Sequence, residues 1–216
     1  MPQSHLDILK QGTYFWNTWR REHPSIQPDL SEADLSGINL TGTDLRGTDQ
    51  EGMGVDLHDA NLQGADFSKA HLRCNLIRAD LKRANLRGVI LNGVDLRGAD
   101  LREALLDGVD LKGAFLGGSN LSGLDLRGRD LRGMNLNTAN LSGANLRGTN
   151  LKGADLSRAN LRDARLNEAD LNETDLSGAD LSEANFFRAS LRGALLKEAI
   201  LRETNFDGAD LTDAII

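Results

Sequence analysis

The sequence predicts an all-β solenoid, a chain wound into short coils that stack on one another. A strict periodicity predicts this fold: from Leu76 to Ile216 every fifth residue is large and apolar, and nearly all of these residues are Leu. The flanking residues strengthen the prediction. The residue two before each centre is small, usually Ala, and the residue one before it is usually Asp or Asn, as in Ala154-Asp155-Leu156-Ser157-Arg158.

A five-residue period fits neither an α-helix nor a long flat strand. A helix turns by about 100° per residue, so a five-residue step would scatter the Leu side chains around its axis. In a flat strand successive Leu would alternate between the two faces, because five is odd. The period does fit a short extended piece followed by a corner, in which Ala and Leu face inward and Asp or Asn faces outward. Corners that all bend the same way bring the Leu side chains together on one axis, and successive coils then pair through their backbones.

Composition and charge exclude several classes of protein. Of the 216 residues only 4% are aromatic, and no stretch approaches the roughly 18 consecutive apolar residues of a membrane span. The first residues lack the basic and apolar regions of a secretory signal. The single cysteine, Cys74, excludes an internal disulfide framework and fits a reducing compartment. The net charge of −7 disfavours direct binding to nucleic acid or to an acidic membrane. We therefore expect a cytoplasmic protein.

The Ala-(Asp/Asn)-Leu-x-x array resembles the pentapeptide-repeat proteins, and the resemblance covers about residues 28–216. It implies a right-handed quadrilateral parallel β-helix with four pentapeptides per coil, which gives roughly nine coils here. It also implies a bacterial source. On this interpretation the chain has two parts, a capping helix with a linker over residues 1–27 and a pentapeptide-repeat β-helix over residues 28–216.

The register of the repeat slips between Leu45 and Leu57. These residues are twelve positions apart, which is two more than two repeats. We expect Gln50 to be the intervening centre and Met53-Gly54 to be the extra pair. An insertion of two residues predicts a bulge at the edge of a coil rather than a recognition loop.

A second slip lies between Leu72 and Leu76, which are only four positions apart. It predicts a tightened corner. Cys74 then occupies an inward position and His71 an outward one. Their spacing resembles a metal-binding pair, but the side chains should point apart, so we expect no metal site.

Residues 1–27 lie outside the repeat and contain both Trp residues and the only Tyr. Ser4 can cap the start of a helix and Pro24 ends the pattern. An amphipathic helix would cover the Leu side chains and the unpaired backbone at the end of the first coil. A docking helix for another protein is the alternative. The residues at helical spacing are Ile8, Leu9, Gly12, Phe15, Trp16 and Trp19.

The sequence predicts no enzyme, no cofactor and no metal ligands. The four histidines have no ligand spacing, and the Ser residues have no His/Asp constellation beside them. Glycines such as Gly93, Gly98 and Gly113 recur at corner positions, where they supply turn geometry rather than a phosphate-binding loop. The outward Asp and Asn residues are expected to bond to local backbone or to solvent.

One coil departs from the small-residue rule, since the residues two before its centres are Ser119, Leu124, Arg129 and Met134. A buried unpaired Arg would be very costly. Arg129 should therefore reach outward or find a carboxylate, and the coil would widen locally. A partner-binding patch formed by Phe115 and Arg129 is the alternative.

The last coils place apolar residues at the outward position, namely Leu195, Ile200 and Ile215, and Phe187 also faces outward. Leu195 and Ile215 are twenty residues apart and should lie on one face in adjacent coils, with Ile200 on the neighbouring face. We expect no cap after Ile216. This pattern predicts an association surface, through which a two-fold homodimer would form end to end. A frayed terminus with scattered apolar residues is the alternative.

We therefore expect a non-catalytic module that presents flat, mixed-charge faces to a protein partner. The alternative function, implied by one branch of the family, is a DNA mimic that binds gyrase and protects it from quinolones. Overall acidity favours that alternative. Residues 76–164 carry 14 basic and 10 acidic groups, however, and this basic middle argues against it.

Overall fold

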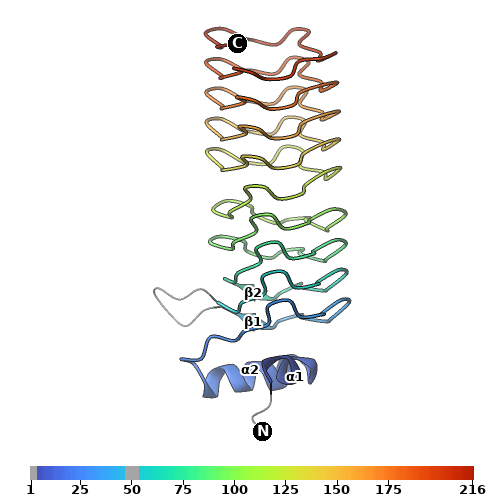
Figure 1. Cartoon of the computed structure of the whole chain (residues 1–216), viewed down its shortest axis with the longest axis vertical. Helices are drawn as coiled ribbons and strands as arrows, with labels where there is room; N and C mark the ends of the chain where they lie inside the picture. The colour runs from blue at the N-terminus through green and yellow to red at the C-terminus, as the bar shows by residue number, and fades with distance from the viewer. Residues whose placement is uncertain (1–3, 47–53) are drawn as a thin grey trace. The chain divides into compact units, whose positions relative to one another are not determined.

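The computed structural model describes residues 4–46 and 54–216. The chain divides into an N-terminal unit, Met1–Ala114, and a C-terminal unit, Phe115–Ile216. The N-terminal unit contains the helices α1 (His5–Lys10) and α2 (Thr13–Glu22) and the paired strands β1 (Asp44–Leu45) and β2 (His71–Leu72) (Figure 1). Elsewhere the coils of each unit are joined by single-residue parallel bridges.

Each pentapeptide is a short extended piece followed by a β-turn. In a typical repeat of the C-terminal unit, the carbonyl oxygen of Leu156 accepts the N–H of Ala159 at 3.0 Å. The third residue of this turn, Arg158, has a φ of 57°, which fits a type II turn. The outward Asp155 closes the turn a second time, because its Oδ1 accepts the N–H of Ser157 at 3.0 Å. The predicted corner is therefore a β-turn supported by an outward Asp or Asn side chain.

Successive coils of the C-terminal unit pair at a register of twenty residues, as expected for four repeats per coil. Asp155 bridges Asp175 in parallel, and Asp175 bridges Leu195. The N–H of Asp175 donates to the carbonyl of Ala154 at 3.0 Å, and the N–H of Leu156 donates to the carbonyl of Asp175 at 2.7 Å. The outward residues of neighbouring coils are thus aligned in columns, one column on each side of the coil.

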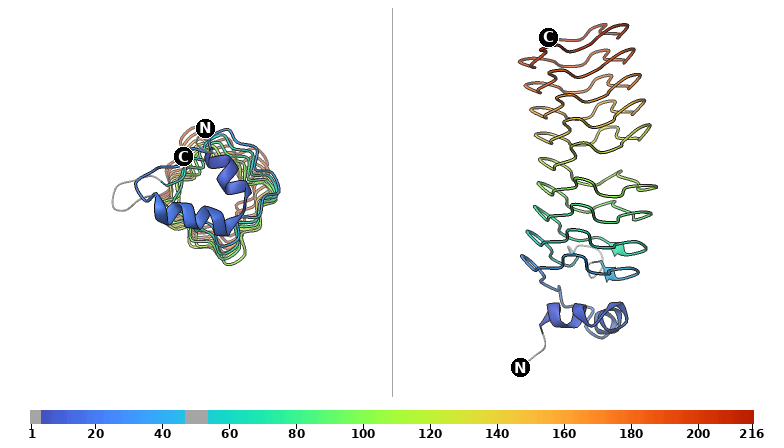
Figure 2. Two further views of the ribbon diagram at one scale, coloured as in Figure 1. Left: turned by 90° about the horizontal axis from the view of Figure 1, so that it is seen from below. Right: turned by 90° about the vertical axis from the view of Figure 1, so that its right-hand side faces the viewer.

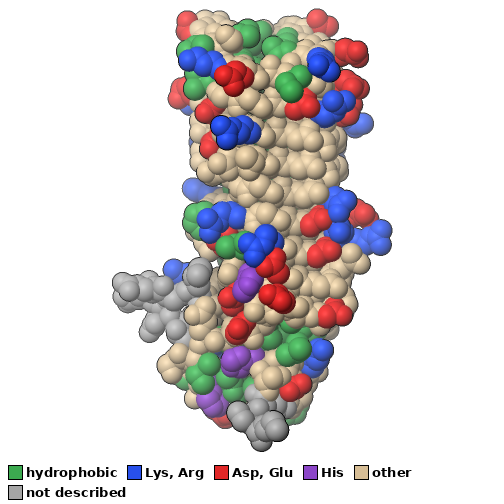
Figure 3. Space-filling view, in the orientation of Figure 1, with side chains coloured by type: hydrophobic (Ala, Val, Ile, Leu, Met, Phe, Trp, Pro, Cys, Tyr) green, Lys and Arg blue, Asp and Glu red, His purple; other side chains and the backbone are tan. Residues whose placement is uncertain are grey.

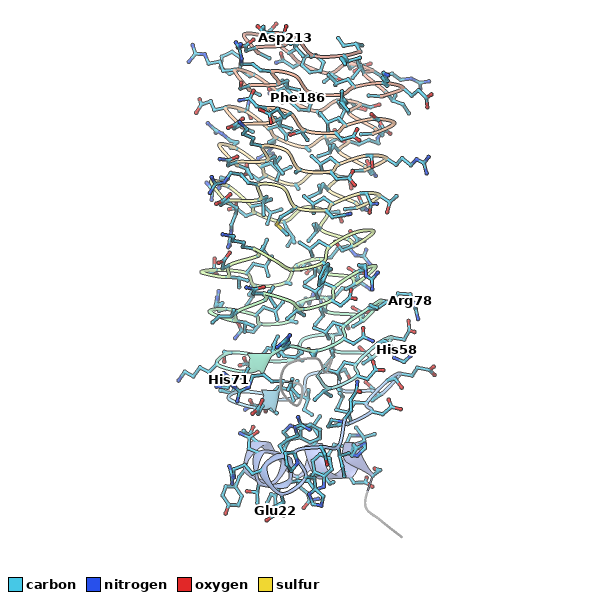
Figure 4. All side chains as sticks on the ribbon, turned by 90° about the vertical axis from the view of Figure 1, so that its left-hand side faces the viewer. Glu22, His58, His71, Arg78, Phe186 and Asp213 are labelled. Atoms are coloured by element: carbon cyan, nitrogen blue, oxygen red, sulfur yellow. The ribbon has the colours of Figure 1, made fainter. Side chains whose placement is uncertain are left out.

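The inward side chains form the interior of each unit. Leu156 is completely buried, as are most of the other repeat centres. Inward polar residues find partners in the backbone: the Thr149 hydroxyl donates to the carbonyl of Leu126 at 2.9 Å. Phe186 lies inside its coil, where its ring stacks on that of Phe206 with centroids 5.1 Å apart (Figure 4). The predicted inward ladder is therefore present.

The first coil is longer than predicted. Asp29 bridges Asp56, and the equivalent pair Asp34 and Asn61 is separated by 27 residues instead of twenty. The expected repeat centred on Gln50, with its insertion of two residues, falls on positions outside the described part of the chain. Backbone pairing sets the register, so the repeat that follows Leu45 in the ladder is the one centred on Leu57. Gln50 and Met53 themselves lie outside the described residues.

The second predicted slip is confirmed. Asp56 bridges Asn75, nineteen residues later, so this coil is one residue shorter than the regular coils. Cys74 is buried and His71 is exposed, as the inward and outward positions require. Their side chains lie on opposite sides of the coil wall. Burial raises the pKa of the Cys74 thiol to about 12, which keeps the thiol protonated and unreactive at neutral pH.

Two helices precede the first coil, not the single helix that the periodicity predicted. Ser4 begins α1 as predicted, since its hydroxyl accepts the N–H of Asp7 at 3.1 Å. Gly12 then adopts a φ of 104°, which interrupts the helix before α2 starts at Thr13. The helical spacing of apolar residues continues across this break, which explains why sequence alone merged the two helices.

The two helices lie across the end of the first coil (Figure 2). Trp16 of α2 is completely buried, and its Nε1–H donates to the carbonyl of Asp44 at 2.8 Å. Asn17 donates through Nδ2 to the carbonyl of Gly42 at 3.0 Å and accepts the N–H of Asp44 at 2.9 Å. These contacts satisfy backbone groups of the first coil.

Candidate interaction surface

The outward residue before each repeat centre normally has a structural task. As in Asp155, the Oδ1 atoms of Asp175 and Asp180 accept the backbone N–H two residues later, at 2.8 and 3.0 Å. An apolar side chain at this position cannot close the turn in this way. Apolar residues that replace Asp or Asn here are therefore not explained by the fold of the repeat, and they are candidates for function.

Six described repeats have an apolar residue at this outward position. Most of these side chains are strongly exposed: Ile90 is 71% exposed, Phe115 53%, Ile200 44% and Ile215 47%. The full set is Ile90, Leu105, Phe115, Leu195, Ile200 and Ile215. Each of them breaks the Asp/Asn consensus of the repeat, and this signal in the sequence extends beyond Phe115 and the last coils to Ile90 and Leu105.

Three of these residues are brought close together in the C-terminal unit. Leu195 bridges Ile215 in parallel, and the N–H of Leu196 donates to the carbonyl of Ile215 at 2.6 Å. Ile200 bridges Asp180 in the next column, separated from Leu195 by one corner. The predicted placement of these residues on one face and its neighbour is confirmed by this register. We call Leu195, Ile200 and Ile215 the apolar edge. Figure 3 shows hydrophobic side chains at the surface of the last coils of the C-terminal unit.

Phe187 does not belong to the apolar edge. It follows Phe186 at the corner between the columns of Asn185 and Ser190, which is diagonally opposite the corner between Leu195 and Ile200. The guanidinium carbon of Arg188 lies 4.9 Å from the centroid of the Phe187 ring. This cation–π contact gives the exposed ring a partner within its own corner.

The irregular coil predicted around Arg129 keeps its regular backbone pairing. The N–H of Arg129 donates to the carbonyl of Leu126 at 3.2 Å, and the Arg129 carbonyl accepts the N–H of Asn150 at 2.9 Å. Arg129 is half-buried, whereas the other three residues that break the small-residue rule are buried: Ser119, Leu124 and Met134. Phe115 begins this coil and Arg129 lies near its end, on the neighbouring column.

Charged side chains near the apolar edge are engaged with one another. Arg192 contacts Asp210 at 3.0 Å, and Arg162 contacts Glu183 at 3.0 Å. The pKa of Asp210 falls to about 2, first because the Thr212 hydroxyl and N–H donate to the carboxylate and then because Arg192 lies beside it. Some of the charged groups around the apolar edge are therefore engaged in local ion pairs.

Titratable side chains outside the apolar edge are spread over the coils. His58 and Arg78 extend outward from the N-terminal unit (Figure 4). Hydrogen bonding to Asp56 raises the pKa of His58. Among residues 4–46 and 54–216, no group of three or more His, Cys, Asp or Glu is placed to hold a metal ion. In the same part of the chain no helix is long and apolar enough to span a membrane.

Comparisons with known proteins agree with the coil geometry. The family model described as pentapeptide repeats matches eight copies, over residues 29–49, 53–98, 74–113, 104–143, 119–158, 139–178 and 179–216. No curated protein matches the chain.

Solved structures of pentapeptide-repeat proteins resemble this chain. One of them is HetL of the cyanobacterium Nostoc sp. strain PCC 7120, which is involved in heterocyst differentiation regulation. HetL is 31% identical to this chain, with a TM-score of 0.51. The match covers 91% of this chain and 95% of HetL. A thylakoid-lumen protein of Arabidopsis thaliana is 36% identical over 47% of this chain and 70% of that one, with a TM-score of 0.46. QnrB1, a plasmid-mediated fluoroquinolone resistance protein, is 22% identical over 87% of this chain and 78% of that one, with a TM-score of 0.34.

The family model matches nearly the whole repeat region. This match agrees with the five-residue period, the turn at each corner and the twenty-residue register. The fold is the right-handed β-helix solenoid of these proteins. The chain belongs to the pentapeptide-repeat family.

Proposed function

We propose that this protein is a non-catalytic protein-binding module whose docking surface is the apolar edge formed by Leu195, Ile200 and Ile215. The observation that supports this proposal is the loss of turn-closing Asp or Asn at three neighbouring outward positions. Such a loss gives up a hydrogen bond at each corner and exposes apolar surface, which is a cost without benefit to the isolated coil. HetL is named for a part in regulation rather than for a reaction, in agreement with this class of function.

The partner proposed for the apolar edge is a second copy of the chain. Leu195 and Ile215 are bridge partners in adjacent coils, and a two-fold axis through this pair would close the assembly at a dimer. Phe115, Arg129 and Phe187 are secondary candidates for contacts with a partner. We further propose that the protein acts in the bacterial cytoplasm.

Sedimentation equilibrium across a wide concentration range tests the proposal. The triple variant Leu195→Asp, Ile200→Asn and Ile215→Asn restores the family consensus, so it should fold as well as the parent while losing the apolar edge. A concentration-dependent dimer that becomes a monomer in this variant supports the proposal. The control is Ile90→Asn with Leu105→Asn, which restores the consensus in the N-terminal unit and should leave the dimer intact.

The observation that favours the DNA-mimic alternative is the negative charge of residues 165–216, which contain 11 acidic and 5 basic groups. Several of these carboxylates are already paired, as in Glu173 with Lys152 and Glu183 with Arg162. Such pairing favours protein binding through the apolar edge over a free acidic surface. Dose-dependent inhibition of gyrase supercoiling by the purified protein would instead support the mimic.

A further inference from the structure

Four arginines converge on one pocket between α2 and the first two coils of the N-terminal unit. The pocket has a volume of about 560 Å³. Helix α2 contributes Arg20 and Arg21, and the coils contribute Arg46 and Arg73. The only carboxylate among the described lining residues, Asp44, is already paired with Arg46 at 2.8 Å. The remaining lining residues are Asn17, Pro24, Gly42 and His71.

Arg20 is the most unusual member of this group, because it is only 9% exposed. Its Nη1 donates to the carbonyl of Ile26 at 2.8 Å and its Nη2 to the carbonyl of Arg46 at 2.7 Å. Its Nε is buried and has no hydrogen-bond partner among the described residues. Two neutral carbonyls position this guanidinium, and the one carboxylate that acts on it, Asp44, is shared with Arg46, so the pocket wall carries more positive than negative charge.

Both slips of the repeat register contribute to the pocket. Strands β1 and β2 pair Leu45 with Leu72, so the residues that follow them, Arg46 and Arg73, emerge from adjacent coils at the same corner. Arg46 precedes the lengthened part of the first coil, and Arg73 lies in the four-residue step that shortens the second. Like charges in register on adjacent strands repel each other; Asp44 offsets the charge of Arg46 only, and a bound anion would reduce the repulsion that remains.

We propose that this pocket binds the phosphate group of a small molecule. Guanidinium groups donate paired hydrogen bonds that match phosphate oxygens, and several guanidiniums arriving from different elements suit a group with several anionic oxygens. The pocket is larger than a phosphate ion alone requires and lies in the size range of small-molecule sites. Pro24 and Gly42 line the same pocket and carry no charge, so they suit the uncharged part of such a ligand. This proposal is independent of the apolar edge, which lies in the other unit.

Isothermal titration of the full chain with inorganic phosphate, inorganic pyrophosphate and ribose 5-phosphate, at constant ionic strength, tests the site. Arg21 and Arg73 are exposed, so Arg21→Gln and Arg73→Gln should fold normally. Each should weaken binding about tenfold or more, since it removes a charge-assisted contact. The matched control is Arg97→Gln, which removes an exposed arginine at the equivalent repeat position outside the pocket and should bind as the parent does.

Ribose 5-phosphate binding more tightly than inorganic phosphate identifies a phosphorylated small molecule, and equal affinity identifies free phosphate; both support the anion site. A second readout is the melting temperature, which phosphate should raise in the parent and in Arg97→Gln but not in Arg73→Gln. Absence of binding to the parent at millimolar anion overturns the proposal. Equal weakening by Arg97→Gln and Arg73→Gln also overturns it, because the effect would then reflect net charge alone.

Discussion

The indole Nε1–H of Trp16 donates to the main-chain carbonyl of Asp44, and with the bond from the Asp44 N–H to Asn17 it joins α2 to the strand that begins the pairing between the first two coils. Trp16 is also completely buried, so it combines a large apolar surface with a directed polar contact. Helix α2 therefore contacts the first coil through both packing and hydrogen bonding.

Replacing Trp16 by Ala should destabilise the protein by about 3–5 kcal/mol, the range for truncating a buried aromatic side chain. Phe at this position keeps most of the volume but loses the bond to Asp44, and it should cost clearly less. Urea unfolding of both variants measures the difference. Removal of residues 1–27 should produce aggregates, and a stable monomeric truncation would show that the helices do not serve as a cap.

Replacing Leu156 by Asp should be among the most damaging single changes, with a loss of more than about 4 kcal/mol, because it buries a charge in the interior. Replacing Arg158 by Ala in the same repeat should change stability little, since Arg158 lies at the exposed corner. Thermal melts of the two variants provide the measurement. Equal losses would contradict the assignment of the inward and outward sides.

Replacing Gly113 by Ala should destabilise more than the same change at Gly123. Both residues have a positive φ, 75° and 70°, which costs an L-residue about 1 kcal/mol. At Gly113 an added Cβ would also lie 2.5 Å from Oδ1 of Asn92, whereas nothing lies within 4 Å at Gly123. Urea midpoints should therefore follow the order parent, Gly123→Ala, Gly113→Ala, and a reversed order of the two variants would contradict the corner geometry.

Asp210 should titrate at about pH 2 in the folded protein, well below its ordinary pKa of 3.8. A carboxylate whose pKa is lower in the folded state stabilises the fold above its unfolded pKa, and this contribution disappears as the pH falls from about 4 to about 2. Asp210→Asn should therefore show less loss of stability over that range than the parent. Side-chain NMR titration gives the pKa directly, and Asp207→Asn is a charge-matched control.

The repeat centres could be predicted from the sequence because their period is fixed by the backbone of a single pentapeptide. Features set by pairing between coils could not. The pairing of Asp29 with Asp56 spans 27 residues, and nothing in the period of a single repeat announces that length. Gly12 separates two helices although apolar spacing continues through it. The pocket arginines are spread from Arg20 to Arg73 in the sequence, and only the register of β1 and β2 brings Arg46 and Arg73 to one corner.

The twenty-residue register of the C-terminal unit has a consequence for how such chains change length. Deleting one complete coil, for example residues 136–155, leaves every later residue on its original side and above a partner of the same type. Deleting a single pentapeptide instead rotates all later columns by one side of the coil, so that Leu195 and Ile215 would move together to a different side. Gene segments that encode whole coils are therefore interchangeable modules, whereas those that encode single repeats reorient the entire surface that follows.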